Sequence, residues 1–219
     1  MSFRVVVAAR GGDDAKSRLA ARLGPSDRQA LVEAMLADML FALRECPEVT
    51  RVYVSTPTPA LARVAARLNA VVLLEPAESD LNLAFEAART RIAAVEPESI
   101  VAFLPGDLPR LDANELARCA AAAKGGVVVV APTLADGGTG ALVFRADTPF
   151  RFAFGPDSLD RHLSVARALG AETRVMPAPS LGFDLDQPSD LEAFLAGGGE
   201  GGRTGALLWR LASSKGAAA

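Results

Sequence analysis

Short apolar runs alternate with longer helical patterns along the chain. Residues 3–9 form a β-branched apolar run that predicts a first strand, whereas apolar residues recur at helical spacing from Leu31 to Leu43. Further strands are predicted at residues 49–56, 71–74, 100–104, 127–131, 141–144 and 173–176, and further helices at residues 59–68, 81–95, 114–123, 157–169 and 188–195. This alternation favours an α/β fold, Rossmann-like, with a mostly parallel sheet and helices on both faces.

A glycine-rich segment at residues 197–205 interrupts this pattern near the C-terminus. Glycine-rich segments are flexible, so we expect a linker there. The part before it, residues 1–196, is long enough to form one domain with a sizeable core. The part after it, residues 206–219, predicts a short C-terminal helix and a tail.

The composition narrows the class of partner. Half of the 219 residues are apolar and the net charge is −3, so the chain has no basic excess that would favour binding to a nucleic-acid polymer. No apolar run approaches the roughly 18 residues of a membrane span. The first residues enter a strand-like run at once, so we expect no secretion signal. Cys46 and Cys119 share no metal-binding spacing, which is typical of reduced core cysteines. We therefore expect a cytoplasmic protein without nucleic-acid or membrane partners.

Three aspartates follow apolar runs and could bring their carboxylates to one edge of the sheet. They are Asp107, Asp184 and Asp186. Aspartates just past parallel strands project into the crevice where open α/β sheets bind ligands. Carboxylate oxygens bind Mg²⁺ beside phosphates, so we expect these three residues to hold a magnesium ion. As an alternative, Asp107 and Asp186 could each cap a following helix.

The loop after the first strand carries two glycines and several cations. Backbone N–H groups in such a loop, next to a helix start, can bind an anion. Lys16 and Arg18 could neutralise a triphosphate, and Arg10 could reach it from the other side. The loop matches neither the GxGxxG nor the P-loop pattern, so a solvated turn with surface cations is the alternative.

A second candidate phosphate site lies at residues 152–158, before a predicted helix. Gly155 would let the backbone approach a ligand closely, and Ser158 would place a hydroxyl at the helix N-terminus. The alternative is that Asp157 or Ser158 caps its own helix. We expect His162, the only histidine, to be a packed or surface residue. The sequence shows no grouping of a nucleophile with a base.

Six short motifs resemble those of one enzyme family and occur in the family's order. They are AKSRL at residues 15–19, LNLA at 81–84, LPGDLP at 104–109, GTGAL at 138–142, FGPDS at 154–158 and DLDQPSDL at 184–191. The family comprises the 2-phospho-L-lactate or phosphoenolpyruvate guanylyltransferases of deazaflavin coenzyme F(420) biosynthesis. The resemblance covers residues 3–195.

The resemblance implies a nucleotide-diphospho-sugar-transferase-like fold of the GT-A type, GTP as donor, a small phosphorylated acid as acceptor, and Mg²⁺. It implies metal ligation by Asp107, Asp184 and Asp186, an acceptor pocket at Thr139, Gly155 and Ser158, and catalytic roles for Asp107, Lys16 and Arg18. It places the nucleotide at Ala8, Ala9, Arg10, Gly11, Lys16, Arg18 and Asn82.

The chain departs from the family pattern at two places. Ala8, Ala9 and Arg10 stand where the family usually has Pro-Val-Lys, and Gly140 stands where it usually has Asn. Arg10 keeps the positive charge with a different geometry. Two other functions stay open: nucleotidyl transfer to another acceptor, such as a sugar phosphate or a molybdopterin, and non-catalytic binding of a nucleotide or phosphoacid. The oligomeric state is open as well, with a homodimer as one arrangement.

Overall fold

In the part of the chain that the structure describes, seven strands form one sheet in the order β3-β2-β1-β4-β6-β5-β7. The computed structural model describes residues 2–12, 14–76, 79–134, 137–197 and 201–216. The strands are β1 (Phe3–Ala8), β2 (Val49–Thr56), β3 (Val71–Leu74), β4 (Ile100–Pro105), β5 (Val128–Pro132), β6 (Thr139–Arg145) and β7 (Thr173–Val175). Only β6 runs antiparallel to its neighbours β4 and β5, while the other pairs are parallel. The mostly parallel sheet is therefore confirmed.

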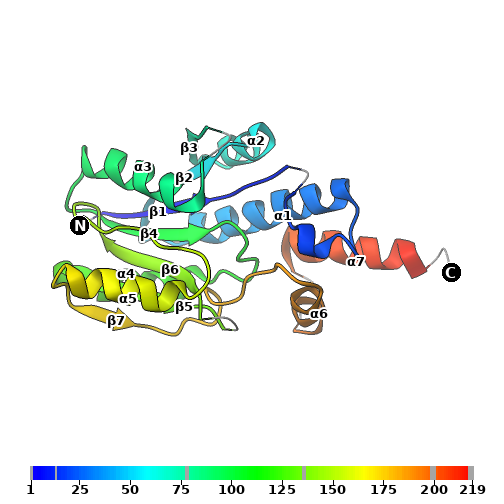
Figure 1. The fold of residues 1–219 in the computed structure, drawn as a ribbon. Helices are drawn as coiled ribbons and strands as arrows, with labels where there is room; N and C mark the ends of the chain where they lie inside the picture. The colour runs from blue at the N-terminus through cyan, green and yellow to red at the C-terminus, as the bar shows by residue number, and fades with distance from the viewer. Residues whose placement is uncertain (1, 13, 77–78, 135–136, 198–200, 217–219) are drawn as a thin grey trace.

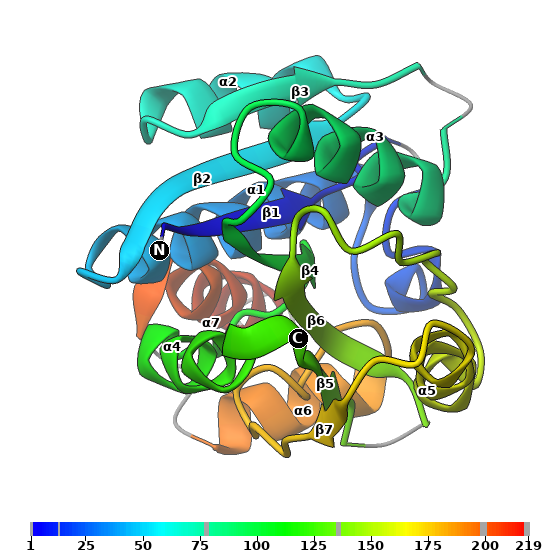
Figure 2. The same cartoon turned by 90° about the vertical axis from the view of Figure 1, so that its left-hand side faces the viewer.

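Helices cover both faces of this sheet, as the strand–helix alternation predicted. They are α1 (Pro25–Arg44), α2 (Pro59–Arg67), α3 (Leu81–Ala93), α4 (Ala113–Ala122), α5 (Ser158–Ala168), α6 (Pro188–Ala196) and α7 (Gly202–Gly216), with short 3-10 helices at Ser17–Leu19 and Lys124–Gly126. One core joins α3 and α5 to the sheet, and a second joins α1, α2, α4, α6 and α7 to the opposite face (Figure 2). None of the helices in the described part of the chain is long and apolar enough to cross a membrane.

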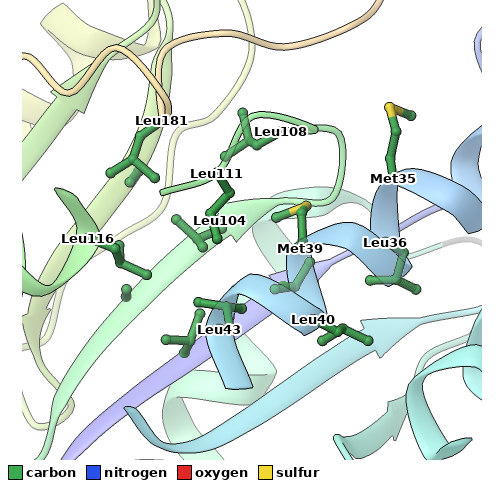
Figure 3. Packing of buried hydrophobic residues seen from close by; sticks show 14 of the residues in the cluster. Met35, Leu36, Met39, Leu40, Leu43, Leu104, Leu108, Leu111, Leu116 and Leu181 are labelled. Carbon is green, nitrogen blue, oxygen red and sulfur yellow. The ribbon is translucent and has the colours of Figure 1, made fainter. Parts of the chain in front are cut away.

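The larger core is built around α1. Met35, Met39 and Leu43 recur on one side of this helix and are at most 1 % exposed. In Figure 3 they lie with Leu104 of β4 and Leu116 of α4 in the same buried cluster. The helical spacing of apolar residues in the sequence therefore identifies the side of α1 that is buried.

The strand order creates a crevice beside β1. The chain passes from β1 to β2 and β3 on one side, whereas β4 pairs with β1 on the other side. Ala8 pairs with Pro105, so the loops that follow β1 and β4 begin side by side. A side chain at Gly106 would place its Cβ 2.7 Å from that of Ala9, so only glycine allows this approach. Open α/β sheets bind ligands at such a point.

The C-terminal helix is longer and better anchored than the sequence predicted. It begins at Gly202, so residues 202–205, predicted as part of a linker, belong to its first turn. Residues 198–200 and 217–219 lie outside the described residues. The carboxylate of Asp38 on α1 accepts hydrogen bonds of 2.8 Å from the N–H groups of Arg203 and Thr204. Figure 1 shows α7 beside α1, where Leu207 and Leu208 are buried.

The smaller core contains the single histidine. His162 on α5 has no exposed surface, so it is a packed residue. Its ring lies 4.8 Å from that of Phe154 and 5.8 Å from that of Phe150, between centroids. Burial, helped by the charge of Arg161, lowers the pKa of His162 from 6.5 to about 4. The imidazole is therefore neutral in the folded protein at neutral pH.

The cap on α7 predicts a specific loss of stability. Asp38→Ala should lower the free energy of unfolding by about 1–2 kcal/mol, because two N–H groups at the helix start lose a charged acceptor. Urea denaturation measures the change. Arg210→Ala, an exposed change on the same helix, should leave stability within about 0.5 kcal/mol of the wild type. Equal stability of the Asp38→Ala variant and the wild type would contradict the capping role.

The buried imidazole predicts a loss of stability in mild acid. The unfolded chain takes up a proton near pH 6.5, whereas folded His162 takes it up only near pH 4. Stability is therefore complete above pH 6.5 and falls as the pH drops towards 4, by about 2 kcal/mol at pH 5. Urea denaturation at pH 7 and pH 5 should show a smaller fall for His162→Gln, which does not titrate. Identical pH dependence in both proteins would contradict this assignment.

Candidate functional site

A lysine joins the loops that follow β1 and β4 with the segment before α6. The ammonium of Lys16 lies 2.7 Å from Oδ2 of Asp107 and 3.4 Å from Oδ1 of Asp186. Only 9 % of the lysine side chain is exposed. Arg18, 69 % exposed, pairs with the other oxygen of Asp186. The structure therefore brings four of the predicted charged site residues into one network.

The backbone of Lys16 adopts a conformation that lysine rarely takes. Its φ of 52° and ψ of 38° are left-handed, at the position before the 3-10 helix Ser17–Leu19. Such a conformation costs a non-glycine residue about 1–2 kcal/mol. Burial alone would lower the pKa of Lys16, but the charges of Asp107, Asp186 and Asp184 outweigh it and raise the pKa. The carboxylates thus hold the lysine charged and offset the backbone strain.

The carboxylates of Asp107 and Asp186 do not cap helices, so that alternative is wrong. Asp112 caps α4 by accepting from the N–H of Asn114. Before α6, the carboxylate of Asp190 accepts from the N–H groups of Asp186 and Gln187. Oδ1 of Asp107 is buried and has no hydrogen-bond partner among the residues that the structure describes.

The three-carboxylate cluster predicted from the sequence does not form in this arrangement. Within the described ranges, no group of three or more His, Cys, Asp or Glu side chains is placed to hold a metal ion. Asp107 and Asp186 converge on the ammonium of Lys16, and Asp184 acts on this lysine through its charge. Two carboxylates together with substrate phosphates are still a fitting ligand set for Mg²⁺. The oxygen of Asp107 that has no hydrogen-bond partner among the described residues would be one such ligand.

A cleft of about 240 Å³ opens beside this charged network. Its walls come from the loops after β1 and β4, from α1 and from the start of α3. The lining residues are Ala8, Ala9, Arg10, Ala15, Lys16, Val32, Met35, Leu81, Pro105, Gly106, Asp107 and Asp186. Ala8, Ala9, Arg10 and Lys16, predicted to contact a nucleotide, therefore line one cleft with two of the predicted metal ligands.

Arg10 and Gly11, like Lys16 and Arg18, have partners within the protein although they are predicted to bind the nucleotide. Arg10 pairs with Glu75 at 2.8 Å and also donates to the carbonyl of Ser79. The N–H of Gly11 donates to Oγ1 of Thr58 at 3.1 Å, so this amide is not directed at an anion. Glu75 was not among the predicted site residues, although it comes directly after a predicted strand.

Asn82 also has a role that the sequence did not reveal. Its Oδ1 accepts from the N–H of Phe154 at 2.7 Å, and its Nδ2 donates to the carbonyl of Phe154 at 3.3 Å. The side chain thus joins the start of α3 to the residue before Gly155. In this arrangement Asn82 positions the segment that forms the second candidate phosphate site.

The three residues predicted for the acceptor pocket gather around the N-terminus of α5. Ser158 is its first residue and is 2 % exposed, and Gly155 precedes it with a φ of +122° that favours glycine. Thr139 begins β6 and is 4 % exposed. In the turn before it, the carbonyl of Gly137 accepts a hydrogen bond from the N–H of Leu159 on α5. Asp157 makes no side-chain cap, so its predicted alternative role as the helix cap is wrong.

The segment 181–186 connects the two candidate phosphate sites. A Cβ at Gly140 would lie 1.7 Å from the carbonyl oxygen of Leu181, so the close packing excludes any side chain there, including asparagine. Further along, the N–H of Leu185 donates to the carbonyl of Asp107 at 3.2 Å. The same short segment therefore contacts β6 at one end and the Asp107 loop at the other.

Comparisons with known proteins show which family the chain resembles. Residues 3–213 match the family model described as "Guanylyl transferase CofC like". The 3-phospho-D-glycerate guanylyltransferase of Phenylobacterium zucineum is 43 % identical over 210 residues, covering 95 % of this chain and 96 % of the relative. The phosphoenolpyruvate guanylyltransferase of Sphaerobacter thermophilus is 36 % identical over 192 residues, covering 88 % of this chain and 92 % of the relative.

The fold is also known from a solved structure of low sequence identity. A chain from Desulfovibrio desulfuricans G20, provisionally assigned as a nucleotide-diphospho-sugar transferase, superposes with a TM-score of 0.79 at 17 % identity. The match covers 97 % of this chain and 96 % of the other. The predicted fold class is thereby confirmed. The family match over nearly the whole length and the identity to curated relatives show that the chain belongs to the CofC-like guanylyl transferase family.

Proposed function

We propose that the protein transfers the guanylyl group of GTP to a small phosphorylated carboxylic acid and releases pyrophosphate. The observation that carries this proposal is the buried Lys16 ammonium between Asp107 and Asp186, at the edge of a cleft beside the switch in strand order. The ammonium would attract substrate phosphates and the carboxylates would attract a cation, as a reaction between phosphates requires. The same reaction would contribute to coenzyme F(420) biosynthesis.

The lining of the cleft favours direct transfer without a covalent intermediate on the protein. Among the described residues that line it, none is Ser, Thr, Cys or His. Burial raises the pKa of Cys119 to about 11, and His162 is buried in the smaller core. An oxygen of the acceptor phosphate would therefore attack the α-phosphorus of GTP directly, with pyrophosphate leaving on the opposite side. Such a reaction depends on positioning and charge neutralisation.

The cations around the cleft are suited to the donor phosphates. Lys16 and Arg18 lie on the loop after β1, and in this structure both form ion pairs with carboxylates. Arg18 is largely exposed, so it can turn from Asp186 to the departing pyrophosphate without loss of buried contacts. Arg10 lines the same cleft, and its ion pair with Glu75 fixes the orientation of its guanidinium group.

Mg²⁺ fits the two carboxylates that face the cleft. Asp107 and Asp186 would hold it together with substrate phosphates, and the charge of Asp184 would add to the attraction. When bound, the ion would neutralise charge on the phosphates and lower the repulsion between donor and acceptor. Lys16 would keep the two carboxylates together before the ion binds.

The N-terminus of α5 is suited to the acceptor phosphate. Ser158 begins α5, whose helix dipole favours an anion at this end, and Gly155 lies three residues before it. Thr139 adds a hydroxyl from β6. Because the 43 % identical relative is named for 3-phospho-D-glycerate, this acid is our first choice over phosphoenolpyruvate and 2-phospho-L-lactate.

A pyrophosphate-release screen tests the proposal. GTP, ATP and CTP would each be combined with 3-phosphoglycerate, phosphoenolpyruvate, 2-phospho-L-lactate, a sugar phosphate and molybdopterin. We expect turnover with GTP and a three-carbon phosphoacid, with the highest kcat/KM for 3-phosphoglycerate. Turnover with the sugar phosphate or molybdopterin alone would replace the proposed acceptor. Nucleotide binding without turnover in any combination would overturn the enzymatic function.

Removal of the central ammonium should abolish most of the activity. Lys16→Ala loses the cation that meets the donor phosphates, so kcat/KM for GTP should fall by about 10²-fold or more. Steady-state kinetics measure the effect. Lys124→Ala removes an exposed lysine outside the cleft and should retain wild-type kinetics. Unchanged GTP affinity and rate in Lys16→Ala would show that the loop is only a solvated turn and does not bind the donor.

Removal of one carboxylate charge should weaken metal binding. Asp186→Asn keeps the shape of the side chain but removes a charged ligand, so Mn²⁺ should bind at least about tenfold more weakly in the presence of a non-hydrolysable GTP analogue. Calorimetry or the Mn²⁺ spin-resonance signal measures binding without turnover. Asp147→Asn is the matched control. Asp147 is also ion-paired, but it follows β6, which runs antiparallel to β4, and so lies near the start of β4, whereas Asp107 follows the end of that strand. Equal Mn²⁺ affinity in both variants would remove Asp186 from the metal site.

A further inference from the structure

Both ring nitrogens of the buried His162 are engaged by the loops of the proposed acceptor site. Nε2 lies 3.0 Å from the backbone nitrogen of Ala153, in the segment that leads to Gly155. Nδ1 lies 2.9 Å from Oγ1 of Thr139. His162 follows Ser158 by one helical turn, so both side chains lie on the same side of α5, and both are buried. One imidazole thus contacts both walls of this site.

The contact at Nε2 decides where the imidazole carries its proton. A backbone N–H can only donate, so Nε2 must accept through its lone pair. A neutral imidazole then carries its proton on Nδ1, from which it donates to Oγ1 of Thr139. The lowered pKa of His162 is consistent with this neutral form at neutral pH.

This arrangement fixes the role of the Thr139 hydroxyl. The hydroxyl accepts from His162, so it cannot donate its own proton back to Nδ1. Its proton is therefore available to another acceptor, and a phosphate dianion offers only acceptor oxygens. The opposite tautomer would make Thr139 donate to His162 and present a lone pair to the dianion, which is repulsive. The tautomer of one buried residue thus decides whether Thr139 attracts or repels a phosphate.

We propose that His162 is a positioning residue that holds the Thr139 hydroxyl as a hydrogen-bond donor to the acceptor phosphate. This role rests on the proposed function, because it needs the acceptor at the N-terminus of α5. The same imidazole holds the segment before Gly155 through Ala153, and Asn82 holds the next residue, Phe154, at both its N–H and its carbonyl. His162 therefore fixes the distance between Thr139 and the Gly155 loop as well as the direction of the hydroxyl.

The wild-type protein offers a direct test, because His162 is the only histidine in the chain. In a long-range ¹H–¹⁵N spectrum of labelled protein, all imidazole signals belong to this residue. We expect a protonated Nδ1 and an unprotonated Nε2 at pH 7.5. Addition of 3-phosphoglycerate in the presence of Mg²⁺ should shift the Nδ1 signal, because Thr139 then gains a charged acceptor.

The possible results separate this proposal from the proposed function. A protonated Nε2 in an enzyme that turns over normally would overturn the positioning role alone. A protonated Nδ1 that no phosphoacid shifts, together with absence of turnover, would overturn the proposed function and the positioning role with it. A protonated Nδ1 that shifts at the acceptor concentrations that saturate turnover would support both.

Two variants distinguish positioning from simple packing. The amide of asparagine reaches the place of Nδ1, so His162→Asn can still donate to Thr139, whereas His162→Gln reaches the place of Nε2 and can still accept from Ala153. We expect His162→Gln to raise the acceptor KM roughly tenfold or more, with GTP KM unchanged, and His162→Asn to raise it only a few-fold. Equal rises in acceptor KM at similar thermal midpoints would overturn the positioning role. The spectrum of the wild-type protein decides the question if either variant fails to fold.

Discussion

The geometry of the cleft depends on one ammonium group placed between two carboxylates. Asp107 and Asp186 come from loops far apart in sequence, and their like charges would repel each other without a cation between them. Lys16 supplies that cation from the loop after β1 and adopts a left-handed backbone to do so. The attraction offsets the strain. Three loops are thereby joined at the point where the strand order changes direction.

The segment 181–186 extends this constraint to the second candidate phosphate site. Its close packing against Gly140 fixes β6, and its hydrogen bond to Asp107 fixes the carboxylate loop. The distance between the two sites is thus set by backbone contacts, which are stiffer than long side chains. In a reaction between two phosphorylated substrates, such stiffness lowers the entropy lost on the way to the transition state.

The sequence predicted most elements because apolar spacing reports burial directly. The apolar run of β4 locates this strand within one residue, and the recurrence of Leu31, Met35 and Leu43 identifies the body and the end of α1. The start of α7 was missed, because its first turn depends on Asp38, which is 165 residues away from Arg203 in the chain. Glycines at residues 201 and 202 then resemble a linker when only local sequence is considered.

The charged residues of the site were predictable from their positions, but their partners were not. Lys16, Asp107 and Asp186 follow strands or precede helices, and the strand order brings those positions together. The pairing of Arg10 with Glu75, by contrast, depends on where β3 ends relative to β1. Asn82 and Phe154 meet because α3 lies beside the loop before α5. Long-range contacts of this kind leave no local signal in a single sequence.

The anchoring of α7 has a consequence for the order of folding. A helix of 15 residues is marginal in isolation, so α7 gains its stability from Asp38 and from packing on α1. Those contacts join the end of the chain to a helix formed near its beginning, and closing so large a loop is slow. We therefore expect the C-terminal helix to be added late in folding and to detach early when the native state opens locally. Such an opening uncovers one side of α1 while the sheet and the loops around Lys16 stay assembled.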